Sequence, residues 1–117
     1  VVATGLMVGK AVEAADELKS KCSVEVIDPR TIVPLDEEAI LRSLGKTGRL
    51  VIVDEDYERC GFSAEVAAIA AEKGFRHLDA PVVRVATPNV LIPYSPALER
   101  HILPSKEKIV KAISQMV

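Results

Sequence analysis

The chain has 117 residues and a formal net charge of −2, because 15 lysines and arginines are set against 17 acidic residues. It contains no basic run, and aromatic residues make up only 3%, so its composition excludes the charge pattern and the stacking surfaces of a nucleic-acid-binding protein. The length suits one domain, residues 1–117, with a single core. A hydrophobic share of 49% is typical of parallel strands that are covered on both faces.

The cysteines and the lengths of the apolar segments indicate the cellular compartment in which the chain is expected. Cys22 and Cys60 lie far apart and form no CxxC pair, which predicts a reducing, cytoplasmic setting. The longest apolar stretches have the length of strands, so the sequence predicts no membrane-spanning segment. We therefore expect neither a membrane nor a nucleic acid among the partners.

The N-terminal half predicts strands and helices in alternation. Residues 1–4 resemble the second half of a strand and a helix over residues 6–19 follows at once, so we interpret the chain as a piece of a longer polypeptide. Residues 24–27 predict a second strand, and Asp36 is a good N-cap for a helix that Gly48 ends. The apolar stripe of the first helix is expected to be Val8, Ala11, Val12, Ala15 and Leu18.

The C-terminal half continues the alternation. It predicts strands over residues 50–53 and 82–85, a helix over residues 63–73, an irregular loop over residues 87–96, and a last helix capped by Ser105. The order β-α-β-α-β-α-β-loop-α, with right-handed crossovers, predicts a three-layer α/β/α fold with a mainly parallel open sheet.

An acidic run follows the third predicted strand. Asp54, Glu55 and Asp56 lie where open α/β sheets bind their ligands. No histidine, lysine or further acidic segment near them in sequence completes a reacting site, so we interpret the run as a solvated loop. A regulatory ligand site at these strand ends, formed by residues 54–57 and Arg30, is the alternative.

No other residue predicts chemistry. The chain has neither a GxGxxG nor a GxxxxGK[ST] motif, which argues against a phosphate site and a standalone flavodoxin-like module. His77 and His101 are isolated, and Cys60 lacks a neighbouring base, so we interpret Cys60 as a packed cysteine. We predict no catalytic, cofactor-binding or metal-binding residue.

The proline-rich loop is unusual because it is apolar. It carries Leu91, Ile92 and Tyr94 where surface loops are normally polar. Either the loop folds back onto the domain, or it is buried against another chain. The sequence leaves both alternatives open.

Several segments share motifs with one enzyme family. Residues 24–36, 46–55, 78–81, 84–85 and 92–96 closely resemble the C-terminal domain of the beta chain of thiamine-diphosphate-dependent 2-oxo acid dehydrogenases, a group that includes the pyruvate, branched-chain and acetoin enzymes. The resemblance covers essentially the whole chain and implies the transketolase C-terminal-like fold. It also implies that an antiparallel strand precedes the chain in the intact domain.

The resemblance places the chemistry elsewhere. In that family, thiamine diphosphate, magnesium and the catalytic Glu and His belong to another domain of the beta chain and to the alpha chain. We therefore expect this chain to hold no cofactor and to be inactive alone, in an enzyme that oxidatively decarboxylates its substrate and transfers the acyl group to lipoyl. The location implied is the bacterial or archaeal cytoplasm, or the mitochondrial matrix in a eukaryote.

The resemblance also implies an assembly role. The partners would be the alpha chain, a second beta chain and the subunit-binding domain of the dihydrolipoyl acyltransferase. Asp79 falls on the family's partner-contacting Asp, with Met116 and Val117 beside it. A turn-forming role for Asp79 ahead of Pro81 is the alternative. Together with Leu91, Ile92 and Tyr94, these are the predicted partner-binding residues.

Overall fold

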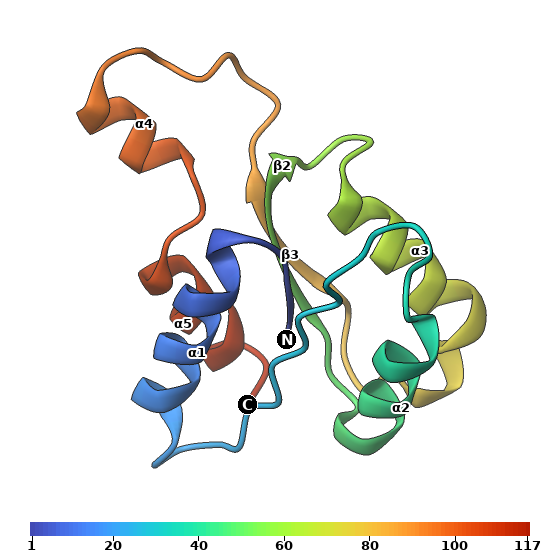
Figure 1. Cartoon of the computed structure of the whole chain (residues 1–117). Coiled ribbons are helices and arrows are strands. Elements are labelled where there is room, and N and C mark those ends of the chain that lie inside the picture. Colours follow the sequence, from blue (N-terminus) through green and yellow to red (C-terminus); the bar gives the residue numbers. More distant parts are fainter.

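A parallel sheet lies at the centre of the computed structural model, which describes residues 1–117 (Figure 1). Its strands are β1 (Val2–Ala3), β2 (Val51–Tyr57) and β3 (Val83–Thr87), in the spatial order β1-β2-β3. Val2 pairs with Ile52, and Ile52 with Arg84, in parallel register. The predicted α/β fold with a parallel sheet is confirmed.

Helices cover both faces of this sheet (Figure 1). Helices α1 (Leu6–Leu18) and α5 (Lys106–Ser114) pack together on one face. Helices α2 (Glu37–Thr47) and α3 (Phe62–Lys73) lie on the other. None of the helices is both long enough and apolar enough to span a membrane.

The core has two halves because successive strand residues face opposite sides of the sheet. Val51 and Val53 face the layer of α1 and α5, whereas Ile52 faces the layer of α2 and α3. All three side chains are buried. This two-sided burial accounts for the high hydrophobic content of the chain.

The helix ends follow the local sequence signals. The side chain of Asp36 accepts a hydrogen bond from the N–H of Ala39 at 3.0 Å, which caps α2. Gly48 ends α2 in the left-handed conformation, with φ of 68°. Ser105 caps α5 in the same manner as Asp36 caps α2. Both predicted N-caps and the predicted stop at Gly48 are confirmed.

The predicted strand over residues 24–27 is wrong in its extent. The structure has only an isolated bridge between Val2 and Ile27, in which the Ile27 N–H donates to the Val1 carbonyl at 2.8 Å. β1, its neighbour, is only two residues long, so there is little ladder for this segment to join. The segment therefore forms the irregular outer edge of the sheet.

The predicted stripe of α1 is also partly wrong. Val12 is 46% exposed, whereas Met7 and Ala14, which the pattern left out, are fully buried with Ala11 and Leu18. The sheet and α5 together cover a stripe rotated toward the alanines, since small side chains allow the close approach of α5.

Two elements were not predicted. A short 3₁₀ helix, η1 (Phe75–His77), follows α3, and helix α4 (Pro96–Ile102) interrupts the region after the predicted loop. Pro96 occupies the start of α4, where a missing N–H costs nothing. In Figure 1 the segment between β3 and α5 loops away from the three layers and carries α4 with it.

Candidate functional site

The predicted partner-binding residues lie at opposite ends of the strands. Because the strands are parallel, their first residues lie together at one end of the sheet, the amino edge, and their last residues lie together at the other end, the carboxyl edge. We call the surface around Asp79, Arg49, Met116 and Val117 the amino-edge surface. We call residues 88–102, which follow β3 and include α4, the carboxyl-edge arm.

Asp79 is held at the amino edge by its backbone. Its N–H donates to the carbonyl of Gly48 at 2.8 Å, and its carboxylate lies directly over the Gly48 α-carbon, so a Cβ there would overlap it. Asp79 is exposed and its carboxylate accepts no hydrogen bond. Asp79 lies in a bend ahead of Pro81, as the turn-forming alternative has it, but its side chain makes no hydrogen bond in that bend and its charge is free.

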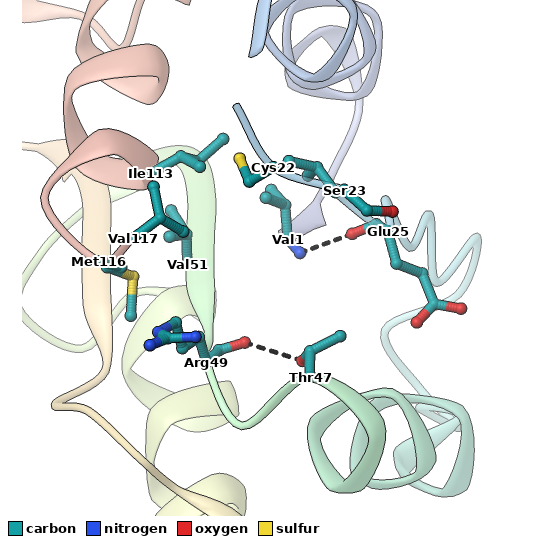
Figure 2. A pocket seen from close by; sticks show the side chains of 11 residues that line it. Val1, Cys22, Ser23, Glu25, Thr47, Arg49, Val51, Ile113, Met116 and Val117 are labelled. Carbon is teal, nitrogen blue, oxygen red and sulfur yellow. Dashed lines mark hydrogen bonds between the residues drawn. The ribbon is translucent and has the colours of Figure 1, made fainter. Parts of the chain in front are cut away.

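A pocket of about 180 Å³ lies within the same edge (Figure 2). Met116 and Val117, just after α5, form one wall, and Cys22 and Ser23 lie across from them. Arg49 contributes to the rim and is exposed. The remaining lining residues are Val1, Val24, Glu25, Thr47, Val51 and Ile113.

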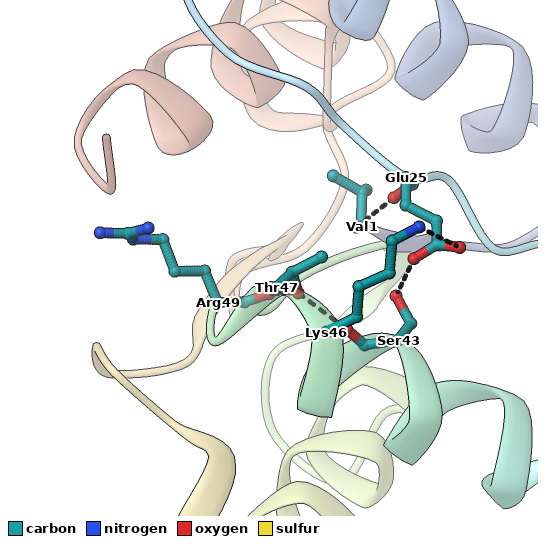
Figure 3. A network of polar contacts seen from close by, with 6 residues as sticks. All are labelled: Val1, Glu25, Ser43, Lys46, Thr47 and Arg49. Carbon is teal, nitrogen blue, oxygen red and sulfur yellow. Dashed lines mark hydrogen bonds and ion pairs between the residues drawn. The ribbon is translucent and has the colours of Figure 1, made fainter.

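Polar contacts join the outer edge of the sheet to α2 beside this pocket (Figure 3). The carboxylate of Glu25 accepts a hydrogen bond from the Ser43 hydroxyl at 2.7 Å and lies 3.7 Å from the Lys46 ammonium. The Ser43 hydrogen bond, followed by the charge of Lys46, holds the pKa of Glu25 below its usual value despite some desolvation. Arg49 points away from this network.

At the carboxyl edge, Asp54 has a structural role. Its carboxylate accepts hydrogen bonds from the Thr4 hydroxyl at 3.3 Å, the Asp56 N–H at 3.2 Å and the Ser63 N–H at 3.3 Å. The last of these satisfies a free N–H at the start of α3, whose N-cap, Gly61, has no side chain to do so. Asp54 therefore joins β1, β2 and α3, and it is buried rather than solvated as predicted.

Other candidate residues at this edge do not converge on Asp54. Arg30 pairs with Asp28 at 2.9 Å, as expected of a residue that satisfies an acidic neighbour. Cys60 is exposed, in the left-handed conformation with φ of 61°, so its interpretation as a packed cysteine is wrong. The turn between β2 and α3 imposes that conformation and points the residue outward. No group of three His, Cys, Asp or Glu side chains could hold a metal ion.

The carboxyl-edge arm exposes several large apolar side chains close together in the sequence. Leu91 is 91% exposed and Tyr94 is fully exposed, and Ile92 and Leu98 are about half exposed. None of the residues of α4 is buried. The loop therefore does not fold back onto the domain, and an apolar surface of this kind is typical of a protein interface.

The sequence analysis missed two basic side chains that the structure places at the edges. Arg49 lines the amino-edge pocket, and no local signal distinguishes it from other surface arginines. The ammonium of Lys108 donates hydrogen bonds to the carbonyls of His101, Ile102 and Leu103, at the end of α4. Since α4 itself was not predicted, its capping by a residue of α5 could not be predicted either.

Comparison with known proteins identifies the family. The profile of the family described as "Transketolase, C-terminal domain" matches residues 1–109. The chain belongs to the transketolase C-terminal domain family. The split-gene transketolase described as an "inactive beta4 tetramer" has the same fold, with a TM-score of 0.81 and 29% identity over 97% of this chain and 36% of that one.

Similar proteins with this domain are beta subunits of oxidoreductases. The chain is 45% identical, over 98% of its length and 34% of the relative, to the acetoin:2,6-dichlorophenolindophenol oxidoreductase subunit beta of Bacillus subtilis. It is also 45% identical to the mitochondrial pyruvate dehydrogenase E1 component subunit beta-1 of Arabidopsis thaliana, over 96% of its length and 31% of the relative. The chain is 38% identical to the 2-oxoisovalerate dehydrogenase subunit beta of Bacillus subtilis, over 99% of its own length and 36% of the relative.

These comparisons confirm the resemblance and its fold. The chain spans about a third of the length of the curated relatives it matches. The similar beta subunits come from bacteria and from plant mitochondria, and their names cover acetoin, pyruvate and branched-chain substrates alike.

Proposed function

We propose that this chain is the assembly domain of the decarboxylating component of a 2-oxo acid or acetoin dehydrogenase complex. The exposed apolar arm is the observation that carries this proposal, because Leu91 is 91% exposed and Tyr94 is fully exposed within one short segment. The names of the similar beta subunits support it, since each belongs to an enzyme of more than one kind of subunit.

Each edge is assigned its own partner. The carboxyl-edge arm packs against a second beta chain and the neighbouring alpha chain, since its exposed surface is mainly aromatic and aliphatic. The amino-edge surface receives the subunit-binding domain of the dihydrolipoyl acyltransferase. There, the free carboxylate of Asp79 offers a bidentate site for an arginine of a basic partner.

The chemistry of the complex belongs outside these residues. The parent enzyme uses thiamine diphosphate and magnesium for oxidative decarboxylation and transfers the acyl group to lipoyl. This chain has no cluster that could hold a metal ion and no phosphate-binding loop, so its residues do not fit the cofactor. We therefore derive no catalytic step from it.

The alternative, a regulatory ligand site at the strand ends, would have Glu55 and Asp56 as its exposed acids, because its other charged groups are engaged. Asp54 is buried and fully engaged with Thr4, Asp56 and Ser63, and Arg30 is paired with Asp28. An open pocket does lie nearby, lined by Tyr57, Arg59 and Cys60 and by residues 89–91 of the arm, and four of these six residues are hydrophobic. This composition favours a protein partner.

Calorimetric titration with the subunit-binding domain of an acyltransferase tests the amino edge. We expect binding that weakens as salt is raised, and we expect Asp79→Lys to weaken it about a hundredfold, because reversing one charge of a close pair costs several kcal/mol. Asp16→Lys, an exposed acid on α1, is the control and should bind as the wild type does. Equal affinity of Asp79→Lys and the wild type would remove Asp79 from the site.

A further inference from the structure

The carboxyl-edge arm has little to hold it in place. None of the residues of α4 is buried, and no strand or other helix packs extensively against α4. At its start, the arm is tied to the domain where Asn89 accepts a hydrogen bond from the Arg59 N–H at 3.0 Å. The direction in which α4 projects must then be decided at its other end.

That end is occupied by the ammonium of Lys108, which comes from α5. It donates hydrogen bonds to the carbonyl oxygens of His101 at 2.7 Å, Ile102 at 3.0 Å and Leu103 at 2.7 Å. These carbonyls belong to the last turn of α4 and the residue after it, where a helix lacks internal partners and carries partial negative charge. All three N–H donors of the Lys108 ammonium are therefore used at one helix end.

The surroundings make this contact strong. The Lys108 side chain is partly buried, and desolvation lowers its pKa, so the ammonium is partly withdrawn from competing water. Pro104 is buried and fixes the chain between α4 and α5, and the Lys10 ammonium donates to its carbonyl at 3.4 Å. Lys108 itself lies on the first turn of α5, and the next residue, Ile109, is buried in the core between α5 and the sheet.

We propose that Lys108 is the positioning residue of the carboxyl-edge arm, which it holds in the orientation that a second copy of the beta chain meets. This inference rests on the proposed function of the arm as a subunit interface. A second copy is the occupant that the arm's composition favours. The arm exposes Glu99 beside Arg100, so that two copies facing each other can pair opposite charges around their apolar side chains.

The physical effect is pre-organisation. An arm that moves freely loses conformational entropy when it is fixed at an interface, and that loss weakens binding. Capping by Lys108 orders the arm before it meets its partner. Without the ammonium, three carbonyls lose their donor and α4 frays from its C-terminal end.

Hydrogen exchange tests the capping step. In Lys108→Met, amide exchange in residues 99–103 is expected to rise about tenfold or more, whereas exchange in β2 and α1 stays unchanged. Lys111→Met is the matched control, because Lys111 lies on the same helix, is exposed and makes no polar contact. Unchanged exchange in residues 99–103 of Lys108→Met would overturn the proposal.

Self-association of the beta chain, measured by analytical ultracentrifugation, tests the positioning step. Lys108→Met should weaken association about tenfold, with Lys111→Met unaffected and Lys108→Arg largely restored, because arginine keeps the charge and several donors. Tyr94→Asp reports on the arm itself. If Tyr94→Asp weakens association but Lys108→Met does not, the positioning role fails and the interface stands; if neither does, the proposed interface fails as well.

Discussion

The two edges of this sheet differ in what they offer a partner. At the amino-edge surface, Asp79 and Arg49 are exposed charged residues, and Arg49 lines a small pocket. The carboxyl-edge arm, in contrast, projects from the domain with apolar side chains exposed (Figure 1). Charged, flush surfaces steer and orient a partner, whereas exposed apolar ones supply most of the binding energy.

The two edges also differ in how the chain uses the positions where ligands usually bind in open α/β sheets. The carboxyl ends of parallel strands are where open α/β proteins usually bind small ligands. In this chain, Asp54 is used there to cap α3 and to join neighbouring strands, and the following loops display Leu91 and Tyr94. The edge that commonly holds a substrate displays exposed apolar side chains instead.

Disrupting the arm should have the largest effect. The double substitution of Leu91→Asp and Tyr94→Asp places charges at the centre of the proposed interface, and should weaken self-association of the beta chain about a hundredfold or more. Unfolding by urea should change little, within about 0.5 kcal/mol, because both side chains are exposed.

Phe75→Asp serves as the control for this experiment. Phe75 is 72% exposed on η1, at the amino edge and outside the arm. If Phe75→Asp disrupts self-association and the arm variant does not, the roles of the two edges are exchanged.

Replacing Gly48 should have an intermediate effect, at the amino edge only. Gly48→Ala places a Cβ in the left-handed conformation and against the carboxylate of Asp79, so we expect a loss of about 1–2 kcal/mol in the free energy of unfolding. Displacement of Asp79 should weaken acyltransferase binding in parallel. Urea unfolding and calorimetry measure the two effects.

Gly45→Ala is the matched control on the same helix. A Cβ at Gly45 would meet only the His77 ring at 3.7 Å, an ordinary contact, and alanine favours the helix by about 1 kcal/mol. Gly45→Ala should therefore stabilise the domain and leave binding unchanged. Destabilisation by both variants would show that α2 tolerates no added carbon, whatever its position.

The smallest effect is expected at Glu25, on the rim of the amino-edge pocket. Its pKa is lower in the folded state than its ordinary value of 4.5, so its stabilising contribution is present above that value and is lost as the pH falls through the folded pKa. Glu25→Gln should therefore lower the urea midpoint slightly at about pH 7, and the difference should shrink as the pH falls below 4.5. Glu38→Gln, which removes an exposed pair with Arg42, should change neither midpoint measurably.

Local chemistry made much of this fold predictable. Asp36, Gly48 and Ser105 mark helix ends through side-chain hydrogen bonds or a left-handed conformation, both of which depend on a few neighbouring residues. The alternation of strands and helices likewise follows from apolar periodicity. For the site, sequence similarity selected Asp79 and apolarity selected the loop before α4, and the structure shows both to be exposed.

Errors arose wherever a distant neighbour decided the outcome. The stripe of α1 depends on how α5 lies across it. Helix α4 was missed because prolines precede it and because its end is capped by Lys108 from another helix. None of these contacts leaves a signal in the neighbouring sequence.

By itself, therefore, the sequence determined the layered α/β class, most helix ends and the family. Only the tertiary structure decided that the predicted partner residues divide between opposite edges, that Asp54 is buried as a structural link, and that the Lys108 ammonium reaches the last carbonyls of α4. The physical reason is the distance along the chain over which each interaction acts. Periodicity and capping act within a few residues, whereas burial and the direction of a projecting loop depend on chain segments brought together by folding.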